Sequence, residues 1–358
     1  MLLIHEIKNL VFSGGGQRGF AYVGALKELE AKGIVFSKLH GFGGTSIGAL
    51  FGLLLCAGYT PAEMEHEMYI LDIHKIIDFN ITTLFQDYGL DNGRRLQKLL
   101  IKYLKHKHFH GGVTFQEMYE LTGVRLVLIG CNINTYEEYM MSHETTPTMR
   151  VVDACHMSMS LPLLFSPMKH NNALYVDGGI INNFPMQYFP ATSTLGFRLN
   201  WGVAFQIGSM DQFFARLAYC ALGQSEYIQW IKLEEAHKLN TITIEVGDVS
   251  TVNLHMSNPH KELIVNTGRL SVCKAIPQGA QPPTSKVGLR EAEPTLHSTT
   301  PRWSVLQNAT MEDANLLTQT ILGQLISSVR CEISSEAALR SGAHCGVASG
   351  EAEARPRK

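Results

Sequence analysis

Two glycine-rich turns near the start of the chain constrain its fold more than any other feature. The first is Gly14-Gly15-Gly16-Gln17-Arg18-Gly19, directly after an apolar run, and the second is Gly44-Thr45-Ser46-Ile47-Gly48, thirty residues later. Each turn stands between a stretch typical of a buried strand and a segment whose apolar residues have helical spacing. Strand-turn-helix units of this kind predict an α/β fold with its reactive groups at strand ends.

The remaining pattern extends this alternation. We expect a helix over 20–32 that Gly33 terminates, and a fully buried helix over 47–57 that Gly58 terminates. A further helical pattern covers 212–239. Strands are expected at 10–12, near 41–43, and at 124–129, 174–176, 203–207 and 241–246. Strands that alternate with helices predict a mostly parallel central sheet.

Composition changes near residue 271 and defines the expected domains. The chain has 358 residues, of which 45% are hydrophobic and 17% charged, which suits a buried core. We expect one domain over 8–270, a Pro/Ser/Thr-rich linker over 271–309, and a C-terminal helix with a disordered tail over 310–358. The last helix would place Leu317, Ile321, Leu325 and Val329 on one face.

Charge and cysteine usage narrow the compartment and the partners. A formal net charge of −2 predicts no nucleic-acid partner. The seven cysteines contain no C-x-x-C pair, which favours reduced thiols in a cytoplasmic protein. The first residues lack the features of a signal peptide, and the apolar segment 47–57 is too short to span a bilayer.

The two turns together can perform acyl chemistry. A serine hydroxyl needs an exposed position, a base and a means of stabilising the oxyanion. Gly44 and Gly48 would allow a strained turn that presents Ser46 at a helix N-terminus. The free N–H groups of the first turn could then hold the oxyanion, with Arg18 adding positive charge. A serine that only caps a helix is the alternative.

Nucleotide and metal sites fit the sequence less well. The first turn matches the G-x-G-x-x-G dinucleotide fingerprint, but residues 34–44 contain no acidic residue to hold a ribose, and no G-K-[S/T] follows. His106, His108 and His110 alternate without a Cys, Asp or Glu partner at zinc spacing. We therefore expect no cofactor and no metal.

A base for Ser46 is available in Asp177-Gly178-Gly179, after a short apolar strand. A partly desolvated carboxylate within hydrogen-bond reach can accept the serine proton directly. A turn aspartate without a catalytic role is the alternative, because Asp-Gly is a common turn pair. A histidine triad would instead need a late histidine, for which His237, His255 and His260 are the candidates.

The ordered set of glycine loop, Ser46 turn and Asp177-Gly178-Gly179 resembles the patatin-like phospholipase family, over roughly residues 8–270. The stretch 158–167 is similar to the proline-containing segment before the aspartate in that family. The resemblance implies a three-layer α/β/α fold, with Ser46 as nucleophile and Asp177 as proton acceptor. It also implies an oxyanion hole around the first turn, for which Gly14, Gly15, Gly16, Arg18 and Gly19 are the candidates.

The resemblance further implies hydrolysis of fatty-acyl esters of phospholipids or other glycerolipids through an acyl-serine, without a metal. An acyltransferase that uses the same dyad and a non-catalytic lipid-binding protein are the alternatives. Such a protein must reach a membrane or lipid surface. The basic, aromatic stretch 106–110 with Lys102 and Lys105, or the apolar face over 317–329, could make that contact.

Overall fold

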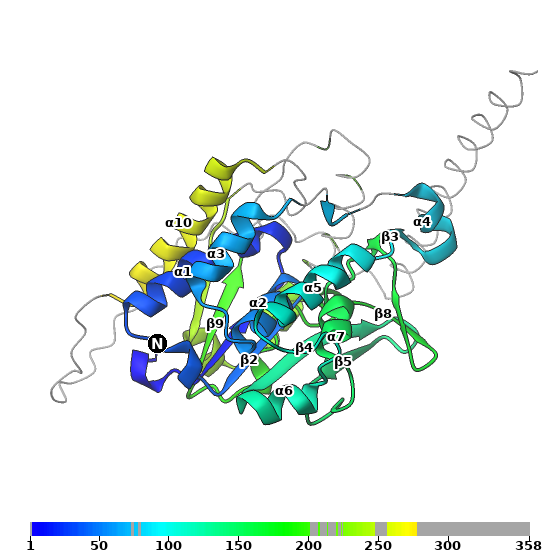
Figure 1. Ribbon diagram of the computed structural model, residues 1–358. Helices are drawn as coiled ribbons and strands as arrows, with labels where there is room; N and C mark the ends of the chain where they lie inside the picture. The colour runs from blue at the N-terminus through cyan, green and yellow to red at the C-terminus, as the bar shows by residue number, and fades with distance from the viewer. Residues whose placement is uncertain are drawn as a thin grey trace, which may run out of the picture. The chain divides into compact units, whose positions relative to one another are not determined.

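A mostly parallel sheet forms the centre of the fold (Figure 1). The computed structural model describes residues 2–72, 75–77, 80–200, 225–247 and 256–277, with residues 207, 213, 220 and 223. Five adjacent strands run parallel, in the order β10 (Thr241–Ile244), β9 (Thr194–Leu199), β1 (Asn9–Phe12), β2 (Gly41–Thr45) and β4 (Arg125–Asn132). Three antiparallel strands follow: β5 (Glu137–Met141) and β8 (Ala173–Asp177) pair with β4, and β7 (Met168–His170) pairs with β8.

Both faces of this sheet are buried. On β1, Leu10 and Phe12 belong to one apolar cluster and Val11 to another. On β4, Leu128 belongs to the first cluster and Val127 to the second, because successive side chains of a strand point to opposite faces. A sheet with a core on each face requires a covering layer on each side, which confirms the expected three-layer α/β/α fold.

Helices cover the first face. They are α1 (Phe20–Ala31), α2 (Ile47–Cys56), α3 (Pro61–Ile70), α5 (Arg94–His106), α6 (Phe115–Thr122), α7 (Val151–Ser158) and α10 (Asn258–Ala275). Figure 1 shows α1 and α10 packed side by side. Their backbones touch, since a Cβ at Gly24 would overlap the Val265 carbonyl and one at Gly268 would overlap the Ala21 carbonyl.

The second face is covered by fewer described elements. Phe184, Met186 and Phe189 pack there, and Trp230 and Leu233 lie against them. Residues 225–232 are helical, and a short helix α9 (Glu235–Leu239) follows. Near the end of the sheet, β3 (Gly89–Asp91) pairs with β6 (Leu163–Phe165) in a separate two-stranded sheet that α4 (Ile81–Asp87) precedes.

Most of the expected elements are found, and the differences are instructive. The helices expected over 20–32 and 47–57 correspond to α1 and α2. The helix expected over 212–239 is interrupted within the described residues, because residues 233–234 separate the helical stretch 225–232 from α9. Strand β9 was not expected, because Gly196 and Arg198 interrupt its apolar pattern. Residues 203–206 of the strand expected at 203–207 lie outside the described residues.

The expected domain boundary at residue 270 falls inside a helix, since α10 continues to Ala275. Nearly all of the linker expected over 271–309, and the whole of the helix and tail expected over 310–358, lie outside the described residues. The cysteines that the structure describes are all free thiols: Cys56, Cys131, Cys155, Cys220 and Cys273.

Candidate active site

Ser46 is the single residue between β2 and α2, and its backbone is strained. Its φ is 57° and its ψ is −124°, a region that non-glycine residues rarely adopt. Two glycines permit this turn: a Cβ at Gly44 would overlap the backbone of Gly48, and one at Gly48 would overlap the Phe12 carbonyl. The turn therefore holds Ser46 at the N-terminus of α2, where the helix dipole favours negative charge.

The strand register brings Asp177 to Ser46. On one side of β4, Thr45 is opposite Ile129, so that Ser46 follows at the level of Gly130. On the other side, Asp177 pairs with Gly130 itself, at the end of the antiparallel strand β8. The two residues thus flank one position of β4, and the Ser46 side chain lies close enough to the Asp177 carboxyl group to lower its pKa.

Burial makes Asp177 a stronger base than an ordinary aspartate. Its side chain is 1% exposed, and it accepts a hydrogen bond from the Gly179 N–H at 2.7 Å. Desolvation raises the pKa of Asp177 from 3.8 to about 6, although the nearby Ser46 side chain and the Gly179 N–H oppose the rise. The chain can follow this path because Gly178 has no Cβ; a Cβ there would overlap the Ile129 carbonyl. Asp177 can therefore accept a proton at neutral pH.

The glycine loop faces Ser46, but not all of its N–H groups are available. A Cβ at Gly14 would lie 3.1 Å from the Cβ of Ser46, so this loop passes directly over the serine. The Gly14 N–H donates to the Asn183 carbonyl at 3.1 Å. The N–H groups of Gly15 and Gly16 have no acceptor in the part of the chain that the structure describes. The Gly14 N–H is thus already bonded and holds the loop, and the oxyanion role of the loop stays a prediction.

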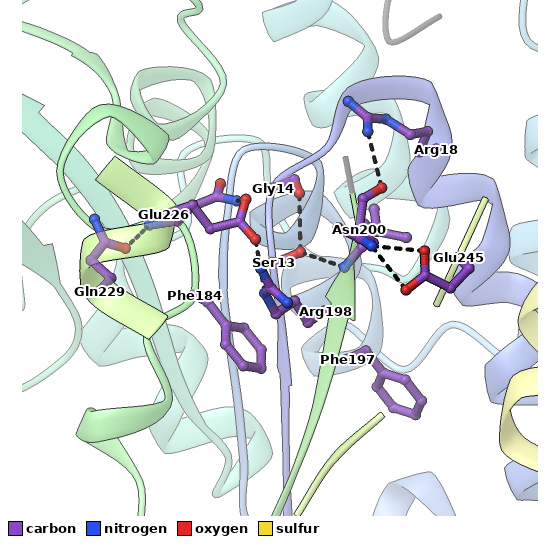
Figure 2. A network of polar contacts seen from close by, with 12 residues as sticks. Ser13, Gly14, Arg18, Phe184, Phe197, Arg198, Asn200, Glu226, Gln229 and Glu245 are labelled. Atoms are coloured by element: carbon purple, nitrogen blue, oxygen red, sulfur yellow. Dashed lines mark hydrogen bonds and ion pairs between the residues drawn. The ribbon is translucent and has the colours of Figure 1, made fainter. Parts of the chain in front are cut away.

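Arg18 and Gly19 also hold the loop in place. The Arg18 side chain is 4% exposed, and its Nη1 donates to the Asn200 carbonyl at 3.1 Å, just after β9 (Figure 2). A Cβ at Gly19 would overlap the side chain of Ile47, the first residue of α2. The observed contacts of both residues are thus with neighbouring backbone and side chains.

Two serines near the end of α7 position the candidate pair. Ser158 is fully buried, and its Oγ accepts the Ser46 N–H at 3.1 Å. The carbonyl of Ser160 accepts the Asp177 N–H at 2.8 Å. Sequence reasoning singled out the segment 158–167 only through its resemblance to the family, and no local pattern identifies either contact. The segment therefore contacts both members of the pair.

The histidines considered as alternative bases do not contact Ser46 or Asp177 where the structure describes them. His237 on α9 is within 2.9 Å of the Phe189 carbonyl, and His260 at the start of α10 is within 3.2 Å of Ser257 Oγ. Neither contact involves Ser46 or Asp177, and His255 lies outside the described residues. Within the described ranges, no three His, Cys, Asp or Glu side chains are grouped as metal ligands.

The basic stretch expected to contact lipid is partly neutralised. Lys107 forms an ion pair with Glu63 at 2.7 Å, and Lys102 approaches Glu67 at 3.6 Å, both acids lying on α3. The apolar face expected over 317–329 lies outside the described residues. Among the helices that the structure describes, none combines the length and apolarity needed to cross a bilayer.

Comparisons with known proteins agree with this architecture. A probable lipid hydrolase of Invertebrate iridescent virus 6 is 34% identical over 184 residues, which are 50% of this chain and 62% of that protein. An uncharacterized protein of Acanthamoeba polyphaga mimivirus is 27% identical over 286 residues, covering 76% of this chain and 94% of that protein. The solved structure of VipD from Legionella pneumophila shares the fold, with a TM-score of 0.56 at 17% identity, over 75% of this chain and 66% of that one.

The family comparison covers the whole candidate site. The model of the patatin-like phospholipase family matches residues 10–190, which include the glycine loop, Ser46 and Asp177. This match extends over half of the chain and contains the three motifs in the order from which the resemblance arose. The chain therefore belongs to the patatin-like phospholipase family.

Proposed function

We propose that this protein is a serine lipid acyl hydrolase that cleaves fatty-acyl esters of phospholipids or other glycerolipids. The observation that carries the proposal is the strand register that sets Ser46 beside a buried Asp177, whose pKa burial raises to about 6. A base of this strength is mostly ionised at neutral pH and lies within reach of the serine proton. The proposal also draws on the family and on the similarity to a probable viral lipid hydrolase.

In the first half-reaction, Asp177 accepts the Ser46 proton while Oγ attacks the ester carbonyl carbon. The N–H groups of Gly15 and Gly16 donate to the oxyanion of the tetrahedral intermediate. The intermediate collapses, the alkoxide leaves, and Asp177 returns its proton to give an alcohol or lysolipid. Ser46 then carries the acyl group as an ester.

In the second half-reaction, water attacks the acyl-serine and Asp177 accepts a proton from the water. Collapse of this second intermediate releases the fatty acid and returns the proton to Ser46 Oγ. The same two N–H groups stabilise both oxyanions, so that one site performs both steps. The ester would be presented at a membrane or lipid surface, which the protein contacts peripherally.

Serine labelling and ester hydrolysis test this proposal together. The full chain is incubated with a fluorophosphonate probe, and turnover is measured on a short-chain p-nitrophenyl ester and on phospholipid vesicles. We expect the probe adduct on the peptide that contains Ser46, and no hydrolysis above background in Ser46→Ala. Ser37→Ala, at an exposed serine, should react as the wild type does. Retained turnover in a folded Ser46→Ala protein would contradict the proposal.

A further inference from the structure

The loop that carries Gly15 and Gly16 is held between two segments. On one side, Ser13 donates its N–H to the Phe197 carbonyl at 3.0 Å, and its Oγ accepts the Leu199 N–H at 3.0 Å. On the other side, the Gly14 N–H donates to the Asn183 carbonyl. The loop is thus held between strand β9 and the segment 178–183, which we call its two walls.

Glu226 joins these two walls. Its side chain is 2% exposed and belongs to the helical stretch 225–232, on the second face of the sheet. One carboxylate oxygen accepts from Arg198 Nε on β9 at 2.9 Å, and the other accepts from Asn183 Nδ2 at 3.1 Å. Figure 2 shows Glu226 and Arg198 beside Ser13 and Gly14. A single buried carboxylate therefore connects the strand on one side of the loop with the residue that holds Gly14 on the other.

Other residues of the same helical stretch fix this connection. Gln229 accepts the Asn183 N–H at 2.7 Å and donates to the Ile181 carbonyl. The guanidinium of Arg198 lies 4.6 Å from the ring centre of Trp230. Glu226, Gln229 and Trp230 are spaced for one side of a helix, so the stretch presents one face to both walls.

We propose that Glu226 is a positioning residue, which holds Arg198 and Asn183 and thereby sets the place of the Gly15 and Gly16 N–H groups over Ser46. The inference rests on the proposed function, in which those groups bind the oxyanion. Loss of this connection would displace the donors in the transition state and leave the binding of the ester almost unchanged. Turnover should then fall while KM stays constant.

Glu226→Gln tests the connection because both partners of the carboxylate are hydrogen-bond donors. The amide of the new glutamine would place its own N–H₂ group against one of these two donors. That hydrogen bond would be lost, and the segment that carries the donor would no longer be held. We expect kcat for a p-nitrophenyl ester, and the rate of fluorophosphonate labelling, to fall at least about tenfold, since small displacements of such groups are costly. KM should change less than about twofold.

Glu144→Gln is the matched control. Glu144 pairs with Arg125 at 2.7 Å, and Arg125 lies over the Phe189 ring at 5.1 Å. This carboxylate, guanidinium and aromatic ring repeat the Glu226 arrangement at the end of β4 that is distant from Ser46. Arg198→Lys is a milder variant, which decides the matter if Glu226→Gln does not fold, and it should lower kcat without changing KM. Wild-type kinetics in folded Glu226→Gln, or in Arg198→Lys if the first does not fold, would overturn the inference.

Hydrogen exchange separates this inference from the proposed function. The Gly14 N–H should exchange faster in Glu226→Gln, or in the fallback variant Arg198→Lys, and at the wild-type rate in Glu144→Gln, whether or not the protein hydrolyses esters. Absence of labelling in the wild type would refute the proposed function alone. Unchanged Gly14 exchange in the deciding variant would refute the positioning role.

Discussion

Asp177 and Glu226 are two carboxylates that the fold buries almost completely, at 1% and 2% exposure. Burial raises the pKa of both, yet their partners differ. Asp177 lies beside the Ser46 hydroxyl and accepts from a backbone N–H, whereas Glu226 accepts from a guanidinium and an amide. A hydroxyl can reverse its role and accept a hydrogen bond, but the guanidinium and the amide N–H₂ can only donate.

In the proposed mechanism, this difference separates the reactive carboxylate of Asp177 from the structural carboxylate of Glu226. Asp177 faces a hydroxyl group that can give up a proton, and burial raises the pKa of Asp177, which makes it a stronger base. Glu226 faces a cation, which stabilises the ionised form and opposes the effect of burial. Equal burial therefore does not imply equal function.

The largest effect is expected for Asp177→Asn. An asparagine cannot accept the Ser46 proton, so kcat should fall at least about 1000-fold, near the upper range for general bases. Because the pKa of Asp177 is raised from 3.8 to about 6, the ionised form costs stability at pH 8, and the variant should be more stable by about 3 kcal/mol. Urea unfolding at pH 8 and pH 4 checks this, since most of the gain should be lost at pH 4, where the folded-state carboxyl is protonated and the unfolded-state carboxyl is about half protonated. Asp87→Asn, at an exposed position, is the control; a destabilised Asp177→Asn protein would contradict the comparison.

Glu226→Gln should change stability with the opposite sign. A glutamine cannot accept from Arg198 and Asn183 at once, so that one buried donor faces another donor and the protein loses about 2 kcal/mol. The same urea experiment at pH 8 measures this loss. If Glu226→Gln and Asp177→Asn were equally stabilising, the distinction between the two carboxylates would be wrong.

The pH dependence of the wild type sharpens the assignment of the base. Since Asp177 must be ionised to accept the proton, kcat/KM on an uncharged ester should fall tenfold per pH unit below about pH 6. Initial rates between pH 4.5 and pH 8.5, with circular dichroism at each pH to confirm folding, give the profile. A rate that stays constant down to pH 5 would exclude Asp177 as the base.

The smallest effect is expected for Ser158→Ala. This change removes the acceptor of the Ser46 N–H and should lower kcat about fivefold, which corresponds to one hydrogen bond of about 1 kcal/mol. Ser160→Ala is the matched control, because Ser160 contacts Asp177 through its backbone carbonyl, which the change retains. Steady-state kinetics of the two variants decide the point. Equal losses would mean that Ser158 has no specific role at the nucleophile.

Local patterns predicted the elements around Ser46 well. Short apolar runs and terminating glycines identify β1, α1, β2 and α2, because strand burial and helix termination leave direct traces in neighbouring residues. Strand β9 has a weaker sequence pattern, because two of its residues are not apolar side chains. Gly196 leaves room for Phe184 and Met186, and Arg198 forms an ion pair with Glu226. Both exceptions result from contacts with residues distant in the sequence.

The sequence by itself determined the family, the α/β class and the candidate residues Ser46 and Asp177, because backbone geometry at tight turns admits few residue types. Only the tertiary structure decided which N–H groups of the glycine loop are available. Gly14 is bonded to Asn183, 169 residues further along the chain, whereas Gly15 and Gly16 are not bonded within the described residues. Hydrogen bonding of a backbone N–H depends on what the fold places beside it, and every residue of the loop carries the same N–H group.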